Sequence, residues 1–137
     1  MEAAAASQMK LFGCKNKMFL DFAATLGRPS ELLESGNHMF IEVAQIDVKP
    51  GMEADFEKGV AAAAPLFKRA KGCHGLELHR SVEKPGRYRL YVAWATVENH
   101  TVDFRGSADF QEWRKHVGHC FLETPYVEHT KQVDKWF

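Results

Sequence analysis

Two ionisable side chains in one short predicted helix could move protons. His100 lies four residues before Phe104, so it borders the apolar side of a helix that the pattern predicts at 97–104. An imidazole in that position can act as a base near neutral pH, although a half-exposed helix histidine fits the same spacing. Asp103 is a carboxylate in the last turn, where the helix dipole disfavours it, which indicates a functional role or a pairing with Arg105. His100 and Asp103 are therefore the predicted catalytic residues.

Three aromatic residues and two histidines are the predicted substrate-binding residues. Trp94 ends a predicted strand, where an aromatic side chain usually fills core volume but can also line a pocket. Phe104 and Trp113 lie on apolar faces of the helices that follow, and we expect them to shape the pocket. His79 and His129 interrupt otherwise apolar strands, so each could point into a pocket or onto a sheet face. The same question arises for three further strand residues, which we interpret as edge or interface residues: Glu42, Gln45 and Glu77.

A metal site is not expected. His116, His119 and Cys120 lie near a helix end, and histidines three residues apart can share a metal ion. However, His119 points away from the direction in which the apolar residues of the same helix are buried, and a helix C-terminus favours histidine in any case. The chain also lacks the GxGxxG, GxxxxGK[ST], GxSxG and HExxH motifs, so nucleotide binding, serine hydrolysis and zinc proteolysis have no support from motifs.

Composition limits the class of protein further. The 137 residues carry 18 basic and 18 acidic side chains, and 45% of them are hydrophobic, which excludes disorder for most of the chain. A net charge of zero argues against an electrostatic nucleic-acid binder and is compatible with self-association. Cys14, Cys73 and Cys120 are far apart and form no CxxC pair, which favours a reduced, cytoplasmic protein. No apolar run is long enough for a transmembrane helix, so we expect no membrane partner.

The elements that must position these residues begin at residue 39. We interpret 1–38 as an N-terminal extension of uncertain origin, partly helical or disordered, and 39–137 as the folded domain. The order β-α-β-β-α-β predicts an α+β, ferredoxin-like fold with a four-stranded antiparallel sheet. The predicted elements are a strand at 39–48, a helix with the apolar face Met52, Phe56, Val60, Ala63 and Phe67, a hairpin of strands at 75–82 and 88–95, helices at 97–104 and after the cap Ser107, and a strand at 126–133.

Both faces of the predicted sheet are apolar. In the first strand, Phe40, Ala44 and Ile46 share one parity, and Ile41 and Val43 share the other. Helices can cover one face only, so a single copy would expose a large apolar patch. The sequence therefore predicts a homodimer in which two sheets pack face to face.

Several short motifs together resemble the antibiotic biosynthesis monooxygenase domain. They are KPG at 49–51, KGC at 71–73, the strand that ends in Trp94, and SADFQEW at 107–113, and the resemblance covers about 39–133. It implies a dimeric α/β barrel with a pocket between the sheet and its helices. It also implies oxidation of a small phenolic, quinol or enolic metabolite with O₂, with no metal, haem or flavin cofactor. In such enzymes the substrate anion passes an electron to O₂, while the protein deprotonates, orients and shields the substrate.

Two alternatives accompany this resemblance. Haem-degrading relatives are similar in fold, but the positions of their asparagine, tryptophan and histidine fall here on Ala44, Asp103 and Trp113, so haem degradation is not expected. Many relatives carry a histidine where Asp103 or Phe104 stands in this chain. The second alternative is a non-catalytic, dimeric small-molecule-binding module, or an isomerase-type enzyme, on the same fold.

Overall fold

The structure is a computed structural model, and it describes residues 39–137. The predicted extension 1–38 lies outside the described residues. The elements are strand β1 (Phe40–Asp47), helix α2 (Glu53–Lys68), strands β2 (Cys73–Arg80) and β3 (Arg87–Trp94), a π-helix (Asn99–Phe104), helix α3 (Ala108–Val117), a 3₁₀ turn (Gly118–Cys120) and strand β4 (Tyr126–Lys131). None of the helices described within 39–137 has the length and apolar character that crossing a membrane requires.

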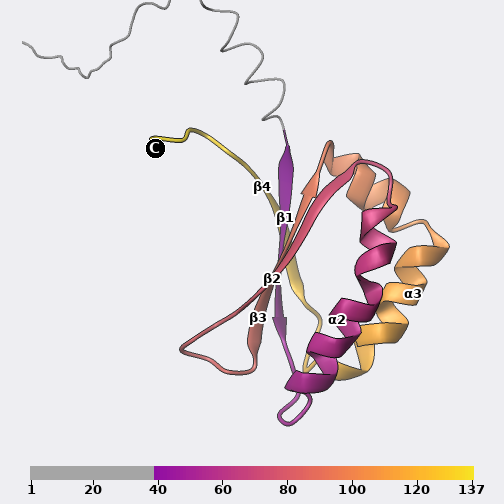
Figure 1. The fold of residues 1–137 in the computed structure, drawn as a ribbon, viewed down its shortest axis with the longest axis vertical. Coiled ribbons are helices and arrows are strands. Elements are labelled where there is room, and N and C mark those ends of the chain that lie inside the picture. The colour runs from indigo at the N-terminus through magenta and orange to yellow at the C-terminus, as the bar shows by residue number, and fades with distance from the viewer. Residues whose placement is uncertain (1–38) are drawn as a thin grey trace, which may run out of the picture. The chain divides into compact units, whose positions relative to one another are not determined.

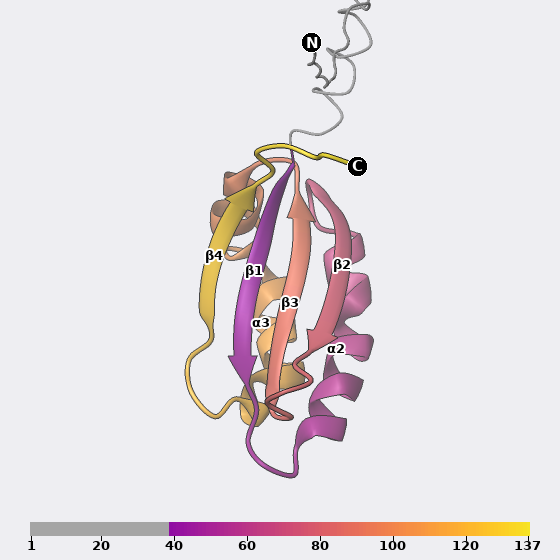
Figure 2. The same ribbon diagram turned by 90° about the vertical axis from the view of Figure 1, so that its left-hand side faces the viewer.

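The four strands form one antiparallel sheet in the order β2-β3-β1-β4. Helices α2 and α3 cover one face of this sheet (Figure 1). Figure 2 looks onto the other face, which we call the open face because no helix of the described chain covers it. The arrangement confirms the predicted ferredoxin-like α+β fold.

Strand alternation decides which side chains face the helices. On β1, Glu42, Ala44 and Ile46 are buried on the helix side, while Ile41 and Val43 point to the open face and are only half-buried. On β3 the helix-side residues are Tyr88, Leu90, Val92 and Trp94, all of which are buried. The predicted apolar face of α2 packs on them, and its buried residues include Phe56, Val60, Ala63 and Phe67. The core therefore lies between the sheet and the helices.

The helix predicted at 97–104 is present and begins with a reciprocal cap. The Thr96 hydroxyl accepts a hydrogen bond from the Asn99 backbone N–H at 3.1 Å, and the Asn99 side-chain oxygen accepts one from the Thr96 N–H at 3.1 Å. Its last six residues are π-helical, which the sequence pattern did not predict. This wider turn buries Asn99, His100 and Phe104 together. A π-helical segment of this kind is frequent at functional sites.

Helix α3 is held at its start by two contacts. The Ser107 hydroxyl accepts a hydrogen bond from the Phe110 backbone N–H at 3.2 Å, which confirms the predicted cap. The Arg69 guanidinium donates two hydrogen bonds to the Asp109 carboxylate, at 2.8 and 2.7 Å, and so ties the end of α2 to the first turn of α3. These contacts fix α3 in front of β1, where it forms one wall of a pocket.

Candidate functional site

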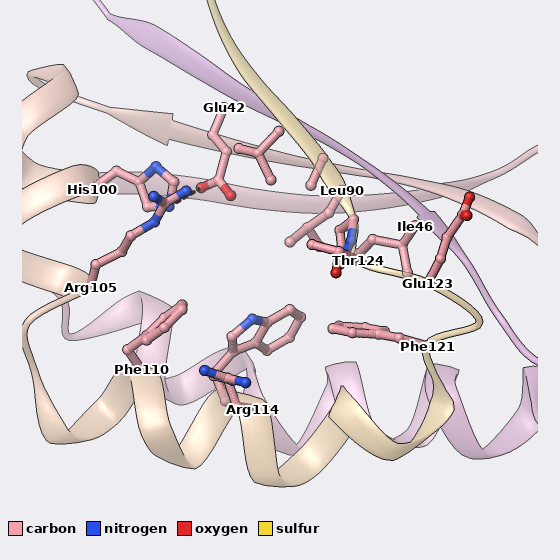
Figure 3. A pocket seen from close by; sticks show the side chains of 14 residues that line it. Glu42, Ile46, Leu90, His100, Arg105, Phe110, Arg114, Phe121, Glu123 and Thr124 are labelled. Carbon is pink, nitrogen blue, oxygen red and sulfur yellow. Dashed lines mark ion pairs between the residues drawn. The ribbon is translucent and has the colours of Figure 1, made fainter.

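A pocket of about 550 Å³ lies between the helix side of the sheet and helix α3. Its volume falls within the range of small-molecule sites. The pocket is lined by Glu42, Ala44, Ile46, Leu90, His100, Arg105, Phe110, Trp113, Arg114, Phe121, Glu123, Thr124, Pro125 and Val127. Figure 3 shows Glu42, His100 and Arg105 together at one end, with Glu123 and Thr124 at the other.

Glu42 supplies a buried carboxyl group at one end of the pocket. It lies on β1, its residue is only 6% exposed, and its Oε1 accepts a hydrogen bond from Trp94 Nε1 at 2.9 Å. Burial raises the pKa of Glu42 to about 7, against the opposing effects of the Trp94 hydrogen bond and the Arg105 charge. A carboxyl group with this pKa can both take up and release a proton near neutral pH.

His100 faces Glu42 from the π-helix. Its Nε2 lies 3.5 Å from Glu42 Oε1, and its ring stacks on Trp94 with 5.4 Å between centroids. Burial lowers the pKa of His100 to about 4, and the charges of Arg105 and His129 add to the lowering. The imidazole is therefore neutral at pH 7, so its contact with Glu42 is not an ion pair.

Arg105 brings a positive charge to the same end of the pocket. It follows the π-helix, and its backbone N–H donates to the His100 carbonyl at 3.1 Å. Within residues 39–137 its guanidinium forms no ion pair. Its charge lowers the pKa values of Glu42, His100 and His129. The guanidinium can therefore pair with an anion that enters the pocket.

The middle of the pocket is apolar and largely aromatic. Phe110 and Phe121 lie on the helix side, opposite Leu90 and Ile46 on the sheet (Figure 3). Trp113 also lines this part, and its ring packs edge-on against Phe67 with 5.0 Å between centroids. Such a surface suits a flat aromatic ring and keeps water away from it.

The structure brings four of the predicted site residues together. His100 and Trp113 line the pocket directly. Trp94 reaches it by its hydrogen bond to Glu42, and His129 lies behind His100, with 2.8 Å between His129 Nε2 and His100 Nδ1. His100 is 3% exposed, so the half-exposed interpretation of this residue is wrong. The π-helical turn carries its side chain further inward than the predicted helix face.

Three other predicted residues lie outside the pocket lining. Asp103 is exposed and accepts a hydrogen bond from the Asn99 side-chain amide at 3.0 Å, so its partner is Asn99. Phe104 is buried in the core, with its ring 4.8 Å from that of Phe67. His79 lies on the open face, where it contacts Glu77 at 3.0 Å and the ring of Tyr91.

Glu42 and Arg105 are site residues that the sequence prediction missed. Glu42 was interpreted as an edge or interface residue, but β1 is a central strand and Glu42 shares its parity with the buried Ala44 and Ile46. That shared parity identifies Glu42 as a helix-side residue only once the face that the helices cover is known. Arg105 was considered only as a partner of Asp103, and nothing in the sequence showed that a π-helical turn would direct it toward the sheet.

Comparison with known proteins gives three results. A family model described as antibiotic biosynthesis monooxygenase matches residues 39–116. The uncharacterized protein YczJ of Bacillus subtilis (strain 168) is 37% identical over 95 residues, which make up 69% of this chain and 100% of that protein. A crystal structure from Bordetella bronchiseptica, provisionally named an antibiotic biosynthesis monooxygenase, is 64% identical with a TM-score of 0.70, and the match covers 70% of this chain and 98% of that one.

A more distant structure is similar in fold alone. SnoaB of Streptomyces nogalater, a cofactor-independent oxygenase, is 17% identical with a TM-score of 0.62. The match covers 72% of this chain and 96% of SnoaB. At this level of identity the likeness concerns the arrangement of helices and strands, and the activity has to be argued from this chain's own pocket.

Proposed function

The chain belongs to the antibiotic biosynthesis monooxygenase family, and from this premise we propose that its pocket oxidises a small phenolic, quinol or enolic metabolite with O₂. The observation that carries the proposal is Glu42, a buried carboxyl group with a pKa of about 7 at the end of an apolar pocket. A general base works best when its pKa is close to the operating pH. Glu42 takes the role that the sequence suggested for His100 or Asp103.

In the proposed reaction, Glu42 accepts the proton of the substrate hydroxyl and Arg105 stabilises the oxyanion that remains. The anion passes one electron to O₂, and the substrate radical and superoxide then combine through a new C–O bond. The outer peroxide oxygen takes up one proton from solvent, which replaces the proton that Glu42 removed, and loss of water leaves a carbonyl group. In the overall reaction, a CH₂ group of the substrate and O₂ give a carbonyl group and H₂O. The substrate therefore supplies all the electrons, and no further reductant is required.

The apolar part of the pocket protects the reactive anion. Phe110, Trp113 and Phe121 can hold the substrate ring against Ile46 and Leu90, which directs its hydroxyl toward Glu42 and Arg105. Exclusion of water also strengthens the attraction between the guanidinium and the oxyanion. We propose that the protein carries out this reaction without a metal or organic cofactor, as a cytoplasmic homodimer that binds neither nucleic acid nor membrane.

The test is O₂ uptake by the purified protein with a panel of quinols, phenols and enols, using isotopically labelled O₂ to follow oxygen into the product. We expect one labelled oxygen atom per product molecule. The Glu42→Gln variant keeps an acceptor for Trp94 but has no base, so we expect its turnover to fall about 100-fold or more. Glu98→Gln is the control, because Glu98 is an exposed carboxylate outside the pocket lining.

Two outcomes would contradict the proposal. Equal turnover in Glu42→Gln and in the wild type would remove Glu42 from the reaction. Binding of panel members without O₂ uptake would instead favour the binding module. A pocket of about 550 Å³ that its own side chains do not fill is needed by either function, so this experiment is what separates them.

A further inference from the structure

Two neutral histidines connect the buried end of the pocket with edge strand β4. We propose that His100 and His129 form a relay that carries the proton from Glu42 to solvent, a role that rests on the proposed function of Glu42 as the base. Without such a route, a proton taken from the substrate would have to leave through the pocket, which the substrate itself occupies. A relay behind Glu42 lets the base reset while the substrate occupies the pocket.

The geometry of the three groups is continuous. Glu42 Oε1 lies 3.5 Å from His100 Nε2, and His100 Nδ1 lies 2.8 Å from His129 Nε2. The second distance is that of a good hydrogen bond, and the first is that of a contact slightly longer than a usual hydrogen bond. Each group comes from a different element, namely β1, the π-helix and β4.

The sheet also places the last member of the chain at the surface. His129 is the direct cross-strand partner of Glu42, so both side chains lie on the helix side of the sheet. Among the strands of residues 39–137, β4 lies at an edge and pairs with β1 alone. His129 is half-buried, whereas Glu42 and His100 are buried. The three groups therefore run from the enclosed end of the pocket to the margin of the domain.

The protonation states suit transfer in this direction. Burial keeps both imidazoles neutral at pH 7, and a neutral imidazole has one N–H donor and one bare nitrogen that accepts. The proton of Glu42 passes to His100 Nε2, the proton on His100 Nδ1 passes to His129 Nε2, and the proton on His129 Nδ1 leaves to water. Three N–H or O–H bonds break and three form, so one proton leaves the site, both histidines end neutral and Glu42 ends as a carboxylate.

The surrounding charges favour the release of the proton. Arg105 is the cation that acts on Glu42, His100 and His129, and it lowers the pKa of each. Trp94 contributes a neutral N–H to Glu42, and burial raises the pKa of the Cys73 thiol on β2, a rise to which the Glu42 charge adds. No carboxylate of residues 39–137 other than Glu42 contacts either histidine of the pair. Beyond Glu42, the relay therefore contains no carboxylate that would hold the proton.

The relay can be tested in the ligand-free protein by carbon-13 NMR of the Glu42 carboxyl group. Its signal is identified by its loss in Glu42→Gln. We expect one averaged signal that moves with pH in the wild type, because the relay exchanges the carboxyl proton quickly. In His129→Gln, which can form hydrogen bonds but cannot pass a proton on, we expect exchange to slow by about tenfold or more, up to separate signals for the two protonation states.

The control variant is His119→Gln, which changes an exposed histidine outside the pocket. Its carboxyl exchange should match that of the wild type. Added imidazole should restore fast exchange in His129→Ala, because it can replace the missing ring at the half-buried position. A merely structural role for His129 would not show such rescue. Equal exchange rates in the wild type and His129→Gln, with both proteins folded, would overturn the relay.

Turnover measurements separate failure of the relay from failure of the proposed function. If the wild type consumes O₂, we expect His129→Gln to lower kcat about tenfold with little change in KM, and imidazole to restore kcat in His129→Ala. Unchanged kcat in both variants would overturn the relay and leave Glu42 as the base. If the wild type oxidises nothing on the panel, the proposed function fails, and the NMR exchange rate still decides whether the relay exists.

Discussion

Burial raises the pKa of Glu42 and lowers the pKa of His100. The raised pKa of Glu42 means that folding favours its protonated form, so its contribution to stability is complete below about pH 4.5 and is lost as the pH rises to about 7. The lowered pKa of His100 means that folding favours its neutral form. Its contribution is complete above about pH 6.5 and is lost as the pH falls to about 4. Between about pH 4.5 and 6.5 one contribution falls with pH while the other rises, so the pH dependences of the two contributions largely cancel.

This cancellation predicts how Glu42→Gln changes the pH dependence of stability. In the variant only the His100 contribution remains, so its free energy of unfolding relative to that of the wild type should rise between about pH 4.5 and 7, the range in which the wild type loses the Glu42 contribution. We expect a relative rise on the order of 1–3 kcal/mol. Urea unfolding at a series of pH values measures it, with Glu98→Gln as the control. Parallel curves for Glu42→Gln and the wild type would show that the Glu42 pKa is not raised.

The charge of Arg105 leads to a prediction about the pH dependence of turnover. Arg105 lowers the pKa values of both Glu42 and His100, so Arg105→Gln should raise both. The rise of kcat/KM with pH that reports the base should then move to higher pH, and its plateau should fall about 100-fold because the oxyanion loses its partner. Arg105→Lys keeps the charge and should keep the position of the rise. An unchanged profile in Arg105→Gln would contradict the role of this residue.

The sequence predicted which residues belong to the site better than it predicted where their side chains point. His100 was predicted as a catalytic residue and His129, Trp94 and Trp113 as substrate-binding residues, and all four lie at or beside the pocket. Glu42 was missed because both parities of β1 are apolar. Alternation alone could not show which parity faces the helices. That choice depends on where α2 and α3 pack, which is a property of the whole sheet.

At the scale of elements, the helix that carries His100 depends on a glycine in a neighbouring loop. Gly72 has φ of +77°, and a Cβ atom at this position would come within 2.0 Å of the Asn99 side-chain oxygen. That oxygen caps the helix by accepting from the Thr96 N–H. Gly72 therefore permits both the turn before β2 and the cap that orients the π-helix.

This contact predicts a large effect of Gly72→Ala. We expect a loss of about 1 kcal/mol from the left-handed backbone and about 1 kcal/mol more from the displaced cap. Gly51→Ala is a matched control, because Gly51 has φ of +87° but no atom within 4 Å of its Cβ position. Thermal unfolding should therefore show a smaller loss for Gly51→Ala than for Gly72→Ala. Equal losses would mean that the cap does not depend on Gly72.

The elements themselves were largely predictable, and their local shape was not. Runs rich in apolar and β-branched residues, bounded by turn residues, located the strands, and the spacing of apolar residues located α2. The π-helical turn at Asn99–Phe104 has no such signal, because the apolar spacing of 97–104 fits an ordinary helix as well. Six residues with one extra residue per turn are enough to redirect His100 and Arg105. The site was therefore less predictable than the fold.

At the scale of the whole molecule, one face of the sheet borders the pocket, and the other is covered by no helix of residues 39–137. The centre of the open face is apolar, where Val43 pairs with Tyr91 and Ile41 pairs with Ala93. Polar side chains of β2 and β4 surround this centre, among them Glu77, His79, Glu128 and Thr130. An apolar centre with a polar rim is the usual composition of a protein interface. Figure 1 shows the segment after β4 leaving on this same side of the sheet.

The segment after β4 adds exposed apolar surface on that side. Val133 is 95% exposed, and Trp136 and Phe137 are exposed as well. Covering exposed aromatic side chains with a second surface is favourable, because it removes apolar area from water. Both features fit the predicted homodimer, in which the open faces of two copies pack together and the segment after β4 reaches the second copy.

A charge at the centre of the open face should therefore dissociate the dimer without damaging the pocket. Val43→Glu places a carboxylate in the middle of the proposed interface, where its burial without a partner is unfavourable by several kcal/mol, so we expect a monomer at micromolar concentration. Val82→Glu is the control, because Val82 is 89% exposed in the β2–β3 hairpin, away from the centre of this face.

Sedimentation velocity distinguishes the two states, and the Glu42 carboxyl titration reports whether each protomer keeps its pocket. A monomeric wild type would contradict the dimer, and a dimeric Val43→Glu would place the interface on another surface. Because Glu42 and Val43 are neighbours that point to opposite faces of β1, the same strand would then hold the base on one side and the partner on the other.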